Sequence, residues 1–279
     1  MKKLRIALFT LAGMIVVFSL PGCKKILDEI KHHPNGKGDN CRVENIYFSA
    51  YYSNANLDPF LFKDTANFKY NVNNQLVSVD FASTKYHYYI GPYPIADRYF
   101  KYDNSGRLQV YLESYFQFDN VTHALFWHKY TYINATQIID SVFNYTSGNP
   151  AGSITPETGD LTRIGKITLD SYGRVIKDEY AWANSTDAPD ITVYSYDGAG
   201  NLVSPGVTYT SKTSIFQTNK TMMFVARDYS VNTRVGEATQ YNSNQLPVKF
   251  VPRGLRAFVT NEQFSISNDE EMIVEYKCK

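Results

Sequence analysis

The chain has 279 residues, and its 28 Lys and Arg residues nearly balance its 27 Asp and Glu residues, for a formal net charge of +1. This balance excludes the strong positive field on which nucleic-acid-binding proteins depend. Tyr (23) and Phe (17) are abundant, and aromatic residues suit the half-buried surface of a sheet.

The first 22 residues have the pattern of a targeting segment. Three basic residues lie within the first five, residues 6–20 are apolar apart from small residues, and Pro-Gly-Cys closes the run at Cys23. This ending resembles the lipobox of bacterial lipoproteins, in which the Cys receives acyl chains, palmitate among them, before cleavage. A membrane-spanning helix is the alternative, but the apolar run is shorter than the roughly 20 residues of a span. We therefore predict a lipoprotein signal peptide over 1–22 and lipidation at Cys23.

Residues 23–40 are predicted to be a lipidated start and a flexible tether, because Gly, Pro, Asn and Asp dominate the second half of this segment. Acyl chains would hold the protein on a bilayer without a spanning element. Lys24 and Lys25 follow Cys23, and no Asp resembling an inner-membrane retention signal is present there, which favours the outer membrane; the leaflet stays open. Removal of the leader changes the formal charge from +1 to −2.

Residues 100–108 contain the most informative pattern of the remaining chain. Asp103 and Gly106 occupy the first and fourth positions of a type I turn, where a carboxylate can accept backbone N–H groups and Gly can adopt a left-handed conformation. Alternating residues from Leu108 onward then predict a half-buried antiparallel strand that pairs through a bulge.

The same device recurs along the chain. Asp and Gly take the same places at 169–175 and 196–202, Asn replaces both at 70–76, and a version that reads as one residue shorter, hence a tighter hairpin, lies at 241–246. The structural role is assigned to Asp103, Gly106, Asp170, Gly173, Asp197 and Gly200.

These residues resemble the YD-type repeat of secreted bacterial proteins, with an aromatic residue, Asp, two variable residues, Gly, a basic or polar residue and Leu. They are also similar to uncharacterised Gram-negative lipoproteins in which such hairpins build one large antiparallel sheet or barrel-like shell. The resemblance implies a fold and no activity.

We therefore predict one all-β domain over 41–279, an antiparallel meander that forms a curved sheet or a barrel-like shell. A long surface loop is expected at 146–163, where Gly and Pro are frequent. Strands are expected at 75–81, 99–102, 108–118, 124–133, 137–145, 165–169, 174–181, 191–196, 222–229 and 245–251, and at both ends of the domain.

Two cysteines, Cys41 and Cys278, lie at the two ends of this domain. If the terminal strands are neighbours, a disulfide there would close a very long loop in an oxidising compartment. Two unpaired thiols are the alternative.

A Tyr-rich stretch at 85–94 is the best ligand-contact candidate, because rigid aromatic faces can stack on sugars or peptides. The candidate residues are Tyr86, Tyr88, Tyr89 and Tyr93. Packing within the sheet is the alternative for them.

Motifs of catalysis or cofactor binding are not found. The sequence contains neither a Gly-x-Ser-x-Gly turn nor a phosphate-binding Gly loop, and acidic neighbours on a strand face opposite ways. The adjacent His32 and His33 lack further metal ligands, while His123 and His128 are expected on opposite faces of one strand, solvated or at the core edge.

We therefore expect no catalytic residues, no metal and no cofactor. The preferred function is a lipid-anchored, non-enzymatic binding or scaffolding protein of the cell envelope with an unknown protein or glycan ligand. An outer-membrane β-barrel and a carbohydrate-binding or carbohydrate-active protein are the alternatives.

Overall fold

A computed structural model describes residues 41–54, 57–82, 98–116, 123–145, 160–250, 264–266 and 271–279. Its strands are β1 (Cys41–Asn54), β2 (Leu57–Tyr70), β3 (Leu76–Phe81), β4 (Arg98–Tyr102), β5 (Leu108–Phe116), β6 (His123–Tyr132), β7 (Gln137–Tyr145), β8 (Asp160–Leu169), β9 (Val175–Trp182), β10 (Asp190–Val193), β11 (Tyr209–Thr213), β12 (Asn232–Arg234), β13 (Ala238–Tyr241), β14 (Pro247–Phe250), β15 (Phe264–Ile266) and β16 (Met272–Cys278). A 3-10 helix, η2 (Ile215–Thr218), and a short α-helix, α4 (Lys220–Ala226), follow β11.

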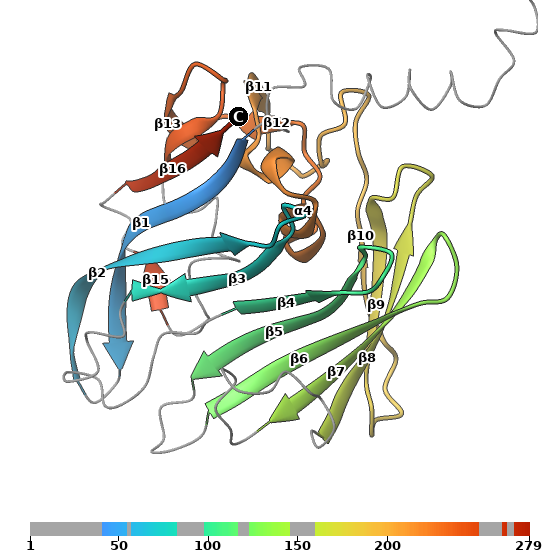
Figure 1. Ribbon diagram of the computed structural model, residues 1–279. Coiled ribbons are helices and arrows are strands. Elements are labelled where there is room, and N and C mark those ends of the chain that lie inside the picture. Colours follow the sequence, from blue (N-terminus) through green and yellow to red (C-terminus); the bar gives the residue numbers. More distant parts are fainter. Residues whose placement is uncertain are drawn as a thin grey trace, which may run out of the picture.

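One antiparallel sheet of 14 strands dominates the fold (Figure 1). Its order is β10-β9-β8-β7-β6-β5-β4-β3-β2-β1-β16-β14-β13, with β15 paired to β1, while β11 and β12 form a separate two-stranded sheet. Strands β1 to β10 thus pair in chain order, as short connections favour. The all-β meander predicted from the sequence is confirmed. The described sheet is open, with β10 and β13 at its two ends.

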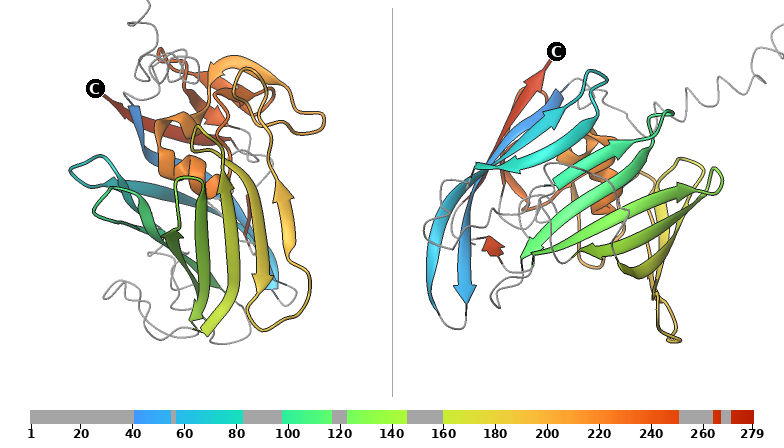
Figure 2. Two further views of the ribbon diagram at one scale, coloured as in Figure 1. Left: turned by 90° about the vertical axis from the view of Figure 1, so that its right-hand side faces the viewer. Right: turned by 60° about the horizontal axis from the view of Figure 1, so that its bottom comes forward.

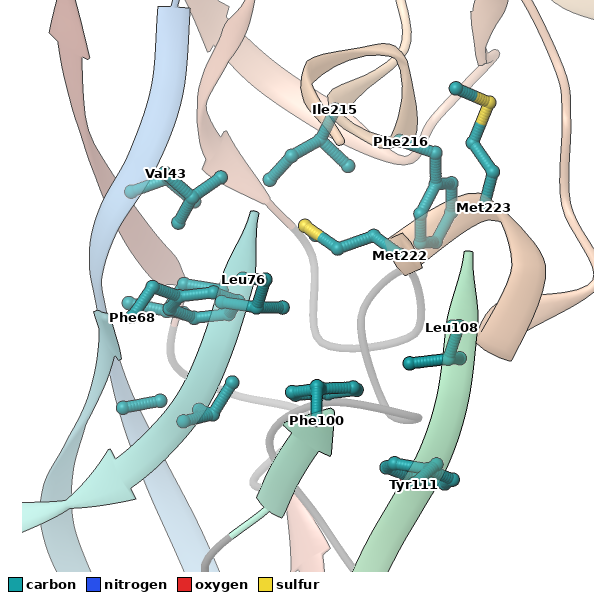
Figure 3. Packing of buried hydrophobic residues seen from close by; sticks show 14 of the residues in the cluster. Val43, Phe68, Leu76, Phe100, Leu108, Tyr111, Ile215, Phe216, Met222 and Met223 are labelled. Carbon is teal, nitrogen blue, oxygen red and sulfur yellow. The ribbon is translucent and has the colours of Figure 1, made fainter. Parts of the chain in front are cut away.

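The sheet curves around α4 and η2, which lie against its concave side (Figure 2). Buried side chains from both helices, among them Ile215 and Met222, join one cluster with Phe68, Leu76 and Phe100 of the sheet (Figure 3). Burial of this apolar area, at about 25 cal/mol per Å², is the main force that holds the curved sheet against the helices.

A smaller apolar cluster lies on the other face of the sheet. Val110 and Leu112 of β5 pack with Trp127 of β6 there, while Tyr111 between them belongs to the concave side. Residues 110–112 of β5 are therefore buried on both faces, and the half-buried strand expected from the alternation is wrong for these residues.

The Asp and Gly hairpins have the geometry expected from the sequence. Oδ1 of Asp103 accepts the N–H groups of Ser105 and Arg107, both at 2.9 Å, and Gly106 has φ +75°. A register shift between Lys101 and Tyr102 marks the bulge that follows. The turns at Asp170 and Asp197 repeat both carboxylate bonds at 2.9 Å, with Gly173 at φ +80° and Gly200 at φ +85°.

The Asn-containing turns adopt the same conformation. Asn71 accepts the N–H groups of Asn73 and Gln75, and Asn74 has φ +59°. At 241–247, Asn242 accepts from Asn244 and Leu246, and Gln245 occupies the Gly position at φ +65°. The prediction of a tighter hairpin there is wrong, because Gln245 takes the left-handed position that Gly occupies in the other turns.

The tyrosines before four of the turns link their hairpins to an earlier segment. Tyr102 donates to the carbonyl of Leu76 at 2.7 Å, and Leu76 begins the strand after the preceding turn. Tyr132 donates likewise to Leu108 at 2.9 Å, and the Arg107 guanidinium lies 4.3 Å from its ring centre. The other two are Tyr70 (to Val43) and Tyr196 (to Val175). Tyr276, within the last strand, donates in the same way to Pro247 and completes what we call the tyrosine ladder.

Two further predictions need correction. The segment expected as a strand at 222–229 contains the end of α4, because Asn219 accepts the N–H groups of Thr221 and Met222 as an N-cap. The expected loop at 146–163 is shorter at its end, since β8 begins at Asp160.

Candidate functional site

The residues predicted from sequence to contact a ligand or carry lipid, Tyr86, Tyr88, Tyr89, Tyr93 and Cys23, lie outside the described residues. The two cysteines of the domain are joined: Cys41 and Cys278 are opposite residues of β1 and β16 and form a disulfide. The terminal strands are thus neighbours, which was the condition for this pairing. Asn244 from the β13–β14 turn lies 3.3 Å from both sulfur atoms.

A group of buried polar side chains lies on the concave face, between β6, β7, β9 and the end of α4. We call it the inner cluster; it consists of His128, Asp140, Asp178, Tyr180, Tyr194 and Arg227. The side chain of Asp140 is fully buried and that of Asp178 is 8% exposed. Ionised carboxylates buried to this extent require partners.

One oxygen of Asp140 gathers two of these partners. Its Oδ2 lies 2.8 Å from Nδ1 of His128 and accepts the hydroxyl of Tyr180 at 2.7 Å. His128 is further enclosed by aromatic rings, with the ring centres of Tyr111 at 5.5 Å and Tyr130 at 6.0 Å. The imidazole is therefore held by one carboxylate and two ring faces.

Arg227 is the cation at the centre of the inner cluster. Its Nε donates to Oδ2 of Asp178 at 2.8 Å, its Nη1 donates to the carbonyl of Phe224, and its Nη2 reaches the Tyr180 hydroxyl at 3.4 Å. The residue caps α4 in a left-handed conformation, φ +56°. This backbone conformation ends the helix where the guanidinium can reach the sheet.

Gly165 of β8 makes room for the inner cluster. A Cβ at this position would lie 2.4 Å from the ring of Tyr180, closer than any real contact. The Tyr180 ring thus occupies the space that a side chain on β8 would fill, and there it reaches Asp140 on β7.

The electrostatics follow from burial and from the neighbouring charges. Burial raises the pKa of Tyr180 far above its usual value, and Asp140 raises it further. Burial and Asp178 together raise the pKa of Tyr194 to about 12. Burial opposes the charge of Arg227, but Asp178, Tyr130 and Tyr180 outweigh this and raise its pKa. At neutral pH the tyrosines are therefore neutral donors and Arg227 is a cation.

Chemically, this arrangement is a set of paired groups in which Oδ2 of each carboxylate accepts every bond, while Oδ1 of Asp140 and of Asp178 is buried without a hydrogen-bond partner among the described residues. Asp178 is paired with Arg227, and Asp140 is paired with His128 and Tyr180. Within the described ranges no group of three or more His, Cys, Asp or Glu side chains is placed to hold a metal ion.

The sequence reasoning missed the inner cluster, although one signal was available. His128 and Asp140 flank one hairpin, and its register pairs Tyr130 with Asp140, so His128 lies two residues further along the same face. The expectation of a solvated or core-edge histidine is therefore incomplete, because its side chain is 17% exposed and held by Asp140. Arg227 carries no such signal, since its position depends on how α4 docks.

A second feature is the exposed end of the sheet at β8, β9 and β10. We call it the β10 end; its large apolar side chains are Ile164, Trp182, Ile191 and Val193, which are 42%, 58%, 55% and 70% exposed. All four residues of β10 are exposed. The arm formed by β9, β10 and their connection projects from the body of the protein (Figure 2).

No protein-family model matches the sequence, and no curated protein matches it significantly. Across the described residues, no helix has both the length and the apolar character needed to cross a membrane. The function must therefore be argued from the geometry of this chain.

Proposed function

We propose that this chain is a lipid-anchored protein of the cell envelope that acts by binding rather than by catalysis, with the β10 end as its binding surface. The observation that carries this proposal is the concentration of exposed apolar side chains at one open end of the sheet. Three of the large apolar residues there, Ile164, Ile191 and Val193, lie on one face of the sheet, since they pair with odd-numbered residues of β9. Trp182 is exposed on the other face of the same edge. Exposed apolar surface on a protein often marks a site of interaction.

The inner cluster supports the non-catalytic part of the proposal. A general base or nucleophile must reach the reacting group of a substrate. Asp140 is instead fully buried, and Asp178 is held by an arginine at 2.8 Å. Asp178 joins the end of the helix to the sheet, and Asp140 holds two residues of the sheet together. Both carboxylates therefore have a structural use, and we assign binding to the outer surface.

The anchor is tested with the full chain expressed in a Gram-negative envelope. We expect the unsubstituted chain to incorporate labelled palmitate and to enter the detergent phase on phase separation. The Cys23→Ala variant should do neither, because it lacks the thiol that receives the lipid. A palmitate-free chain, or equal partitioning of both chains, would contradict the anchor.

The binding surface can be tested by tryptophan fluorescence, since the chain has only two Trp residues. Trp127 is 3% exposed and Trp182 is 58% exposed, so a Trp127→Phe variant leaves Trp182 as the reporter of the β10 end. Soluble glycans and extended peptides are titrated against this variant. A ligand of the β10 end should change the emission of Trp182 and should lose affinity when Ile191→Lys is added.

A matched control keeps this test specific. Val72→Lys places the same charge at a fully exposed apolar residue of the β2–β3 turn, away from the β10 end. Equal loss of affinity in both lysine variants, or a ligand whose affinity is unchanged by Ile191→Lys, would place the binding surface elsewhere. Turnover of a glycan by the purified chain would contradict the non-catalytic part.

A further inference from the structure

Strand β10 is an open edge of the sheet. It pairs with β9 through Asp190–Tyr180, Ile191–Glu179, Thr192–Asp178 and Val193–Lys177, and no other described strand lies beside it. Open edges present unpaired N–H and C=O groups to any strand that can reach them. Here neither Lys nor Pro within β10 blocks that approach.

The backbone groups at the open side belong to Ile191 and Val193. The N–H of Tyr194 bonds to Ile176 of β9, so even-numbered residues direct their backbone groups toward β9. Odd-numbered residues therefore direct theirs to the open side, because these directions alternate along a strand. Ser195 agrees with this, since its carbonyl accepts the N–H of Val203 on that side.

We propose that two copies of this chain associate by antiparallel pairing of β10 with β10, so that the sheet continues across a two-fold axis at Thr192. In this register Ile191 of each copy exchanges both backbone bonds with Val193 of the other copy. All four open backbone groups of each strand are then satisfied. The interface is isologous, as most homodimer interfaces are.

The neighbours of β10 exclude the adjacent registers. An axis at Ile191 would place Val193 opposite Pro189, which has no N–H to donate. An axis at Val193 would place Ile191 opposite Ser195, whose carbonyl is already bonded to Val203. The part of the edge that can pair thus runs only from Ile191 to Val193. The same three residues of a second copy fill it completely.

The side chains suit this pairing. Ile191 and Val193 lie on one face and become cross-strand neighbours of their counterparts, so the apolar side chains of the two copies form one continuous row on that face. Thr192 meets Thr192 on the other face, a favourable β-branched pair. The acidic residue Asp190 lies beyond each end of the pairing, opposite Tyr194 rather than opposite a second Asp190.

So short a strand contact is weaker than an interface of standard size. Confinement of both copies to one membrane raises their effective concentration, in the way that tethering does. The association therefore rests on the proposed lipid anchor, and we expect the dimer on the membrane and the monomer in dilute solution.

The test is cysteine crosslinking of the full chain in the envelope. Directly opposed residues in a non-hydrogen-bonded pair have Cα atoms about 4.5 Å apart, within reach of a disulfide. Two copies of residue 190 would be separated by about 14 Å, which is too far. After mild oxidation, Thr192→Cys should yield at least about ten times more dimer than Asp190→Cys on non-reducing gels.

A second variant checks that the crosslink depends on the edge. Ile191→Lys added to Thr192→Cys should lower the dimer fraction, because it places a charge against Val193 of the other copy. Equal crosslinking at positions 190 and 192, an unaffected Ile191→Lys variant, or no dimer for membrane-bound Thr192→Cys would each overturn the pairing.

If the anchor proposal fails, the chain is recovered without palmitate in the soluble fraction. The pairing is then tested separately by oxidising the purified full chain at about 1 mM, the effective concentration that a short tether supplies. Selective dimer at position 192 under these conditions upholds the pairing while the anchor fails. Its absence there overturns the pairing as well.

Discussion

The hairpin turns and the inner cluster use the same chemistry, an aspartate held by an arginine, in two different ways. In the turn at 169–175, Arg174 lies four residues after Asp170 and donates to it at 2.8 Å. In the inner cluster, Arg227 lies 49 residues after Asp178 and donates to it at the same distance. The first pair shapes a chain reversal, and the second joins a helix to a sheet.

The comparison shows that the two sets of carboxylates are stabilised by different groups. Carboxylates in the turns accept backbone N–H groups from their own hairpin, and Asp103 remains close to solvent. Carboxylates in the inner cluster are desolvated, so the loss of one partner leaves a buried charge alone. Substitutions should therefore be costly in the inner cluster and mild in the turns.

The largest effect is expected from Asp178→Asn, which keeps the shape of the side chain and leaves the buried Arg227 cation without its counterion. The free energy of unfolding should fall by about 3 to 5 kcal/mol, measured by urea denaturation. The matched change in a turn, Asp170→Asn, should cost about 1 kcal/mol. Equal costs would remove the distinction, as would a double variant, Asp178→Asn with Arg227→Met, that is no more stable than Asp178→Asn alone.

Gly165→Ala tests the close approach of Tyr180 to β8. The added Cβ would overlap the Tyr180 ring and move its hydroxyl away from Asp140, so we expect a loss of about 1 to 3 kcal/mol. Thermal unfolding of Gly165→Ala and of Gly165→Ala with Tyr180→Leu gives the measurement. The smaller side chain should restore part of the loss if the overlap is its cause.

Gly173→Ala tests the turn conformation alone. Gly173 has φ +80° with no atom near its absent Cβ, so the cost is conformational, about 1 to 2 kcal/mol. Gly198→Ala is the control, because that glycine lies in open space in the related turn and has no positive φ. Chemical denaturation of both variants should show the loss only for Gly173→Ala.

Tyr102→Phe removes one rung of the tyrosine ladder. Its hydroxyl donates to Leu76 and lies 2.7 Å from Oγ1 of Thr221, and we expect a loss of about 1 kcal/mol. Tyr47→Phe is the comparison, because the Tyr47 hydroxyl bonds to Glu275 on the exposed side of the sheet. A greater loss for Tyr47→Phe would show that the ladder does not hold neighbouring hairpins together.

The smallest effect concerns the pH dependence of stability at Asp103. The backbone N–H of Arg107, and then its guanidinium, lower the pKa of the Asp103 carboxyl below its usual value. A depressed pKa in the folded state gives stability that is present above the unfolded pKa, about 3.9, and is lost as the pH falls through the folded value. NMR titration should find the lowered pKa, and Asp103→Asn should flatten the slope of stability below about pH 4. A pKa at or above the usual value would contradict this reading.

Local patterns determined much of this protein. The Asp and Gly of each turn set the hairpins because their bonds reach only four residues along the chain, and successive hairpins leave little choice but a meander. Gln245 escaped recognition because a residue with a side chain takes the place of Gly there.

Tertiary structure alone decided how the sheet curves and what fills it. Residues 222–226 read as strand but fold as part of a helix, because the N-cap at Asn219 and the apolar concave face favour a helical turn there. The Arg227–Asp178 pair depends on how α4 docks against the sheet, and the open edge at β10 depends on which strands lie beside one another. Residue spacing along the chain predicts neither feature, because each forms only when the curved sheet packs against its helices.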